Sequence, residues 1–142
     1  MKIRLLMLGK TRRPEMNAVL ADYVKRISRS CPIEVTEVRD AEAALKKLDA
    51  DRAASMLLLD AGGKVYDSTA FAKWLGEQRD RGTRELIFVC GDADGFPEIL
   101  RERVKQKISL SAMTYSHELA RVMLAEQLYR AFAILSGSRY PK

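Results

Sequence analysis

Residues 108–134 read ISLSAMTYSHELARVMLAEQLYRAFAI, and they combine a short apolar strand, a polar loop and one long helix. The strand is expected over Ile108–Leu110, and the helix from about His117 to Leu135. The helix has apolar residues over more than one narrow stripe, namely Leu119, Val122, Met123, Leu128, Tyr129, Phe132 and Leu135. We expect a helix this broadly apolar to pack against a partner as well as against the core.

Strands and helices alternate along the chain before this segment. Short runs of apolar residues predict strands, and apolar residues spaced three and four positions apart predict helices. The predicted elements are strand Ile3–Leu8, helix Glu15–Ile27 after Pro14, strand Ile33–Val38, helix Ala41–Leu48, strand Met56–Leu59 ending at Asp60, a turn at Gly62-Gly63, a helix capped by Asp67 or Ser68 and running to Arg79, strand Leu86–Cys90, and helix Ile99–Val104. This order predicts an α/β fold with a mostly parallel sheet flanked by helices on both faces.

The composition is that of one globular domain over residues 1–142. The 47% hydrophobic fraction, together with 31% charged residues, lies near the average of folded proteins. Cys31 and Cys90 have neither metal-site nor disulfide-framework spacing, which favours a reducing cytoplasm. No apolar run approaches the roughly 20 residues of a membrane span. We therefore expect a cytoplasmic protein with no membrane contact.

The net charge of +6 favours association with polyanions. Lys10, Arg12 and Arg13 follow the first strand, and a second basic group, Arg101, Arg103, Lys105 and Lys107, precedes the last strand. Spread cations of this kind suit phosphate contacts that position RNA without reading its sequence. A solvated basic surface explains the same charges, so the charge alone does not choose between the two.

The common phosphate-binding motifs are absent, since neither G-x-G-x-x-G nor G-x-x-x-x-G-K-[ST] occurs. His117 is the only histidine, which leaves no metal site built from paired histidines. The loop Gly91-Asp92-Ala93-Asp94-Gly95 follows a buried strand, where open α/β sheets bind small ligands. Asp60, Asp92 and Asp94 all fall at strand ends, where they either form a site or simply terminate strands.

The string ISLSAMTYSHELARV, continued by LAEQLYRA, resembles the C-terminal signature of the ribosomal RNA large subunit methyltransferase H (RlmH) family, small members of the SPOUT class. In that family the pattern is approximately LSxLTxPHxLxRVxLxEQLYRA. The resemblance implies a C-terminal trefoil knot. It also implies transfer of a methyl group from S-adenosylmethionine to N3 of a pseudouridine in 23S ribosomal RNA, on the assembled ribosome, by a homodimer that needs no metal.

The resemblance also implies roles for individual residues. The cofactor would be held by Leu59, Gly91, Leu110, Ser111, Ala112, Met113, Thr114 and Tyr115, with Leu110 and Met113 forming the walls of the pocket. His117 would organise the loop, Arg121 and Arg130 would face phosphate or the target base, and Tyr140 would help to position the substrate. The tail of each subunit would complete the site of its partner.

Three positions depart from the family pattern. The family has a Gly-Gly-Pro-Glu-Gly type loop where this chain has residues 91–95, and a Pro where it has Ser116. The family tail ends near Pro-Tyr-His and a basic residue, whereas this chain ends Ser138-Arg139-Tyr140-Pro141-Lys142. Two alternatives therefore stay open: the same fold acting on another RNA, and a non-catalytic module that binds the ribosome or RNA.

Overall fold

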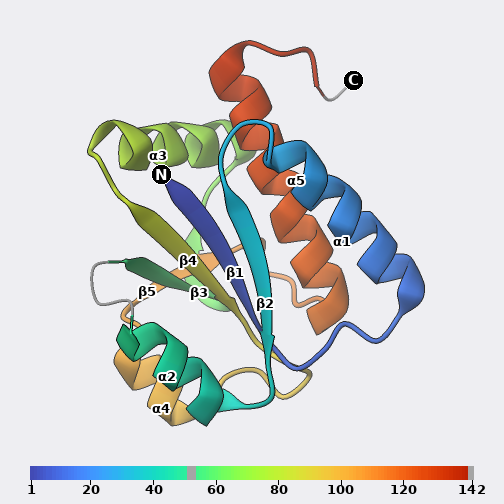
Figure 1. Cartoon of the computed structure of the whole chain (residues 1–142), viewed down its shortest axis with the longest axis vertical. Helices are drawn as coiled ribbons and strands as arrows, with labels where there is room; N and C mark the ends of the chain where they lie inside the picture. Colours follow the sequence, from blue (N-terminus) through green and yellow to red (C-terminus); the bar gives the residue numbers. More distant parts are fainter. Residues whose placement is uncertain (51–53, 141–142) are drawn as a thin grey trace.

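A computed structural model describes residues 1–50 and 54–140. Its elements are β1 (Lys2–Leu8), α1 (Pro14–Ile27), β2 (Ile33–Val38), α2 (Ala41–Ala50), β3 (Ser55–Val65), α3 (Ser68–Asp80), β4 (Glu85–Cys90), α4 (Glu98–Arg103), β5 (Gln106–Ser109) and α5 (His117–Ser136). The named strands pair in parallel, in the order β2-β1-β4-β3-β5 (Figure 1). The predicted α/β fold with a parallel sheet is confirmed. The trefoil knot stays a prediction.

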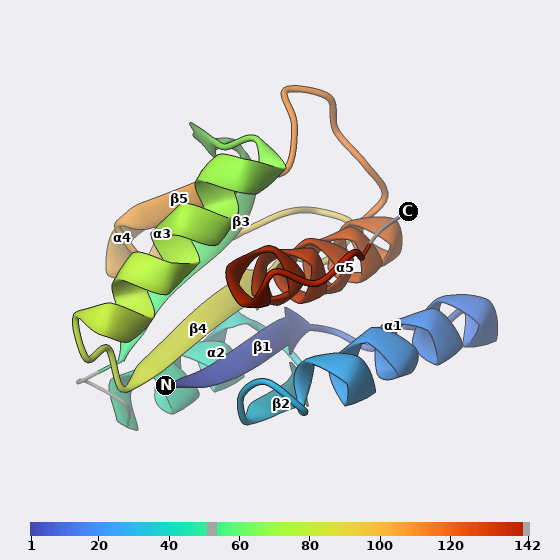
Figure 2. The same cartoon turned by 90° about the horizontal axis from the view of Figure 1, so that it is seen from above.

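Helices cover both faces of the sheet, because alternate residues of each strand point to opposite sides. In β1, Leu5 and Met7 pack with α1, α3 and α5, whereas Leu6 and Leu8 pack with α2 and α4. Figures 1 and 2 show the two layers of helices on either side of the strands. The molecule therefore has two apolar cores that share one sheet.

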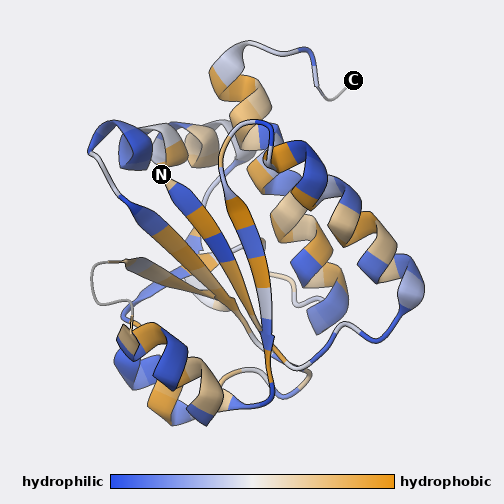
Figure 3. Ribbon diagram, in the orientation of Figure 1, coloured by the Kyte–Doolittle hydropathy of each residue, from blue (hydrophilic) through white to orange (hydrophobic). Residues whose placement is uncertain are grey.

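The strands in the middle of the sheet are the most apolar. Leu86 to Cys90 of β4 are all buried, whereas β2, at the sheet edge, mixes exposed, half-buried and buried positions. Figure 3 shows this contrast as a nearly uniform β4 beside a banded β2. Continuous apolar runs are typical of parallel strands covered on both faces.

The predicted turn at Gly62-Gly63 is wrong, because β3 continues through both glycines to Val65. The pairing of β3 with β5 shifts between Leu59 and Lys64, so the intervening residues form an irregularity inside the strand. A Cβ on Gly63 would lie 2.7 Å from the backbone nitrogen of Ile108. Gly63 is thus explained by the close approach of β5, and the bulge carries Asp60 out of the regular ladder.

The helix starts follow the sequence signals. Pro14 occupies the first turn of α1, where its missing N–H is not needed. The Asp67 side chain accepts a hydrogen bond of 2.7 Å from the backbone nitrogen of Ala70 and caps α3. Ser116 caps α5 by accepting from the backbone nitrogen of Leu119. The predicted helix boundaries agree with the structure to within a few residues.

Candidate active site

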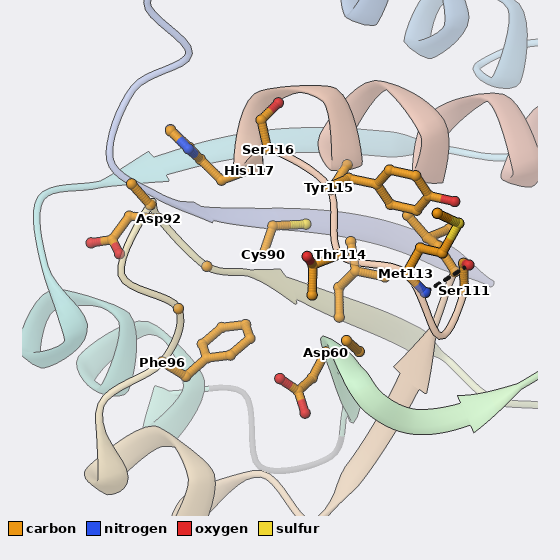
Figure 4. A pocket seen from close by; sticks show the side chains of 17 residues that line it. Asp60, Cys90, Asp92, Phe96, Ser111, Met113, Thr114, Tyr115, Ser116 and His117 are labelled. Carbon is orange, nitrogen blue, oxygen red and sulfur yellow. Dashed lines mark hydrogen bonds between the residues drawn. The ribbon is translucent and has the colours of Figure 1, made fainter.

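A pocket of about 380 Å³ opens at the carboxyl ends of β4 and β5, beside the irregular middle of β3. Its lining comes from the bulge after Leu59, the loop after Cys90 and the loop between β5 and α5. Figure 4 shows Phe96 and Asp60 directed toward the pocket from one side and Thr114 from the opposite side. Cavities of this size, with apolar walls and a few polar groups, are typical of small-molecule sites.

The loop between β5 and α5 is organised by its own serines. The Ser109 hydroxyl donates to the carbonyl of Ser111 at 2.8 Å, and the Ser111 hydroxyl accepts from the backbone nitrogen of Met113 at 3.0 Å. These side-chain bonds to the backbone fold residues 109–113 into a compact turn. The Met113 side chain, 73% exposed, stays at the open side of the pocket.

The loop after β4 is closed by a second local turn. The Asp92 carboxylate accepts a hydrogen bond of 2.8 Å from the backbone nitrogen of Asp94, and Asp92 bridges to Gly95. A Cβ on Gly91 would lie 2.9 Å from the carbonyl oxygen of Gly95, so the loop closes only around a glycine. The closed turn leaves Asp92 on the pocket lining, whereas Asp94 is not part of it.

Most residues predicted to bind the cofactor line this one pocket: Leu59, Gly91, Leu110, Ser111, Met113, Thr114 and Tyr115. Ala112 does not line it. The pocket also takes in Cys90 and Phe96, which sequence reasoning missed. The sequence could have indicated Phe96, because it is an aromatic residue directly after the glycine-containing loop at residues 91–95. Cys90 had none, because a strand-end cysteine is commonly a core residue.

Charge and polarity differ around the pocket. Asp60 forms an ion pair with Arg101 at 3.4 Å, and its side chain is 20% exposed. Cys90 is buried, and this burial raises the pKa of its thiol to about 12, so it is a neutral wall rather than a nucleophile. The lining therefore offers two carboxylates, Asp60 and Asp92, among apolar surfaces.

His117 lines the pocket at the start of α5 and is partly exposed. Its Nε2 lies 3.9 Å from Oε2 of Glu118. Figure 4 places His117 and Asp92 on the same side of the pocket. His117 therefore lies where it could contact a molecule in the pocket, and its role in organising the loop stays a prediction.

Arg121, which was predicted to contact phosphate or the target base, is enclosed within its own chain. Its side chain is fully buried, and its guanidinium donates to the carbonyls of Leu8 and Gly9, to the Thr11 hydroxyl at 3.0 Å, and to the carbonyl of Gly91 at 3.4 Å. Burial lowers its pKa from the ordinary arginine value. Arg121 therefore joins the ends of β1 and β4 from within.

Arg130 and Tyr140 lie away from the pocket of their own chain. Arg130 is 13 positions beyond His117 on α5, roughly 20 Å along a helix that rises about 1.5 Å per residue. Its guanidinium pairs with Glu126 at 2.7 Å, and Tyr140 donates to the same carboxylate at 2.7 Å. Burial and this hydrogen bond raise the pKa of Tyr140. Pro141 and Lys142 lie outside the described residues.

Two further observations limit the kinds of site present. Across residues 1–50 and 54–140, no three His, Cys, Asp or Glu side chains gather in a group that could hold a metal ion. In the same residues, no helix is long and apolar enough to cross a membrane.

The fold matches solved methyltransferases. The tRNA (m1G37) methyltransferase from Aquifex aeolicus superposes with a TM-score of 0.61 and 16% identity, covering 99% of this chain and 75% of that one. The SpoU methyltransferase AviRb from Streptomyces viridochromogenes, solved in complex with AdoMet, gives a TM-score of 0.53 and 12% identity, covering 96% of this chain and 58% of that one. The chain thus has the same fold as these two methyltransferases.

The sequence comparisons are more specific. A family model described as "Predicted SPOUT methyltransferase" matches residues 1–141. The ribosomal RNA large subunit methyltransferase H of Pelobacter propionicus is 41% identical, over 99% of both chains. The chain therefore belongs to the SPOUT methyltransferases, in the family of the ribosomal RNA large subunit methyltransferase H.

Proposed function

We propose that this protein transfers a methyl group from S-adenosylmethionine to large-subunit ribosomal RNA, at N3 of a pseudouridine in 23S rRNA. The observation that carries the proposal is the pocket formed by Leu59, the Gly91 loop and the Leu110–Tyr115 loop at the sheet edge. Family membership supports the choice of cofactor, and so does the AdoMet held by AviRb, which shares the fold.

The residues of the pocket fit this cofactor. Apolar Leu59, Leu110 and Phe96 suit the faces of an adenine ring, and the backbone groups of residues 110–115 suit its edge. Asp60 and Asp92 suit ribose hydroxyls and the cationic ammonium and sulfonium groups. When bound, S-adenosylmethionine supplies a methyl group already activated on a sulfonium.

The protein then has to orient the RNA base and accept the proton that leaves N3. Alignment of a nucleophile in a closed site supplies much of such a rate enhancement. His117 and Asp92 both lie on the lining, and either side chain can receive a proton. We assign His117 to positioning the base. The N3 proton passes to the side chain, His117 or Asp92, that lies closer to N3.

The proposed partners are the assembled ribosome in the cytoplasm and a second copy of this chain. The dimer is supported by an apolar groove of about 470 Å³ between α1, α3 and α5, which includes Val19, Phe71, Val122 and Met123. Val19 is 43% exposed, although it falls on the apolar stripe of its helix. An exposed apolar groove between helices is the kind of surface that a symmetric dimer buries.

The position of Arg130 and Tyr140 also supports a dimer. Both bind Glu126, and Glu126 lines the groove, so the two side chains border the surface where the second copy would lie. We propose that they act in the pocket of the partner, since Arg130 lies roughly 20 Å along α5 from His117, which lines the pocket of its own chain.

Methyl transfer from radiolabelled S-adenosylmethionine to ribosomes tests the activity. Ribosomes from a strain lacking its own enzyme should be labelled, with the label mapping to one pseudouridine. Label on a different nucleotide would change the substrate, and binding of ribosomes without any label would favour a non-catalytic module.

Mixing two inactive variants tests the shared site. His117→Ala damages the pocket and Tyr140→Ala damages the tail, so a mixed dimer holds one intact pocket with one intact tail. If the site is shared, an equal mixture should regain about a quarter of the wild-type rate, because half of the dimers are mixed and each has one working site. A mixture no more active than its components would show that each chain uses its own tail.

A further inference from the structure

The segment Lys10–Arg13 between β1 and α1 carries exposed cations on a firmly held backbone. The side chains of Lys10, Arg12 and Arg13 are exposed, and none of them has a hydrogen-bond or ion-pair partner within residues 1–50 and 54–140. Most other arginines of the described chain, among them Arg26, Arg101, Arg103 and Arg130, are paired with carboxylates. The three side-chain charges of this segment are thus not engaged by a carboxylate in the described part of the chain.

Side chains from three other elements hold the backbone of this segment. Glu118 of α5 accepts from the backbone nitrogen of Arg13 at 3.0 Å, and Glu37 of β2 accepts from that of Thr11 at 2.9 Å. Asn17 of α1 donates to the carbonyl of Thr11 at 2.9 Å.

Arg121 adds two further contacts, since its guanidinium donates to the carbonyl of Gly9 and to the buried Thr11 hydroxyl. We call these contacts of Glu118, Glu37, Asn17 and Arg121 the clamp. A surface loop that served only as a connection would not need so many side chains to fix it. These bonds fix the backbone positions from which the three cations project.

The segment also lies beside the candidate active site. Glu118 directly follows His117, which lines the pocket, and the Arg121 guanidinium contacts both Gly9 and Gly91, the latter in the loop after β4. The cations are therefore fixed relative to the pocket by the same helix end. This arrangement suits a polyanion that must be held in one register while one of its bases enters the pocket.

We propose that Lys10, Arg12 and Arg13 form the surface that grips phosphates of the RNA substrate, with Glu118 as the positioning residue that presents it. The inference rests on the proposed function for the identity of the polyanion. The basic group on α4 and β5 is a weaker candidate, because Arg101 and Arg103 are already paired with Asp60 and Asp49.

The first test is Arg12→Gln/Arg13→Gln, compared with Lys46→Gln/Lys47→Gln, which removes two exposed lysines of α2. Binding to assembled ribosomes is measured at 50 and 200 mM salt. Calorimetry measures S-adenosylmethionine binding, and transfer of labelled methyl groups measures activity.

The arginine variant should have a higher KM for ribosomes, an unchanged kcat and unchanged cofactor binding. Loss of two phosphate contacts lowers the slope of log affinity against log salt concentration by about 1.8. The ratio of wild-type to variant affinity for ribosomes should therefore fall about tenfold between the two salt concentrations. The lysine variant should match wild type. Equal salt slopes in both variants would overturn the proposal, whereas a wild type that binds no ribosomes would count against the proposed function instead.

The second test is Glu118→Ala, which separates positioning from charge. This change makes the chain more positive, so long-range attraction alone predicts tighter binding to ribosomes. The clamp predicts weaker binding, because Arg12 and Arg13 lose the carboxylate that orders their backbone. An equal or higher affinity in a folded Glu118→Ala protein would refute the positioning role.

Discussion

Replacing Arg121 by methionine tests whether this residue holds the site together or contacts RNA. Methionine fills much of the same volume but donates nothing. It would leave the carbonyls of Leu8, Gly9 and Gly91 and the hydroxyl of Thr11 without this donor, in a region where Arg121 is fully buried.

The expected cost follows from two opposing contributions. Hydrogen bonds from a charged donor contribute about 1.5–3 kcal/mol each, and the three shorter bonds therefore contribute roughly 4.5–9 kcal/mol. Removing a buried guanidinium returns several kcal/mol of desolvation cost. Part of that cost is visible in the buried Nε, which has no hydrogen-bond partner among the described residues. We expect Arg121→Met to lower the free energy of unfolding by about 2–4 kcal/mol.

Urea unfolding followed by circular dichroism measures this loss, and calorimetry measures cofactor binding in the folded protein. Arg121→Lys is the matched control, because it keeps the charge but cannot reach acceptors on both β1 and β4. It should fall between wild type and Arg121→Met. We also expect weaker cofactor binding by Arg121→Met, since the Gly91 loop loses its tie to α5.

One pattern of results would refute this reasoning. If Arg121→Met unfolds at the wild-type urea concentration and binds cofactor normally, but binds ribosomes less tightly, then Arg121 contacts RNA after all.

Three further predictions concern the sheet, the loop clamp and the pocket wall. Gly63→Ala should lower the free energy of unfolding by about 1–3 kcal/mol, because its Cβ would press on the backbone of β5. The control is Gly62→Ala, whose Cβ meets only the Asp60 side chain at 3.2 Å. Equal stabilities of the two variants would contradict the close approach of β5 to Gly63. The backbone N–H of Arg13, and then that of Arg12, lowers the pKa of Glu118, so its contribution to stability is present above the ordinary carboxyl pKa and is lost as the pH falls through the lowered value. Acid unfolding of wild type and Glu118→Gln should therefore converge at low pH, and a constant difference down to that pH would be inconsistent with the clamp. Cys90, with its pKa raised to about 12, should react slowly with iodoacetamide at pH 8, and alkylation as fast as that of a free peptide thiol would show that the pocket wall opens.

The sequence of this protein predicts most of its elements, their parallel arrangement and most residues of the loop between β5 and α5 that line the pocket. Apolar runs such as Leu86–Cys90 and the signature from Ile108 onward are local patterns, and local patterns report strand burial, helix faces and caps. For the same reason, seven of the eight residues predicted to bind cofactor line the pocket.

Tertiary structure alone settled the roles of residues whose partners are distant in the sequence. Gly62-Gly63 has the composition of a turn, but the approach of β5 makes it part of a strand. Arg121 has the chemistry of a phosphate ligand, but its position beneath the ends of β1 and β4, more than 100 residues from Leu8 and Gly9, makes it a buried clamp. Burial and hydrogen-bond partners depend on which segments meet in space, and the residue type by itself does not contain that information.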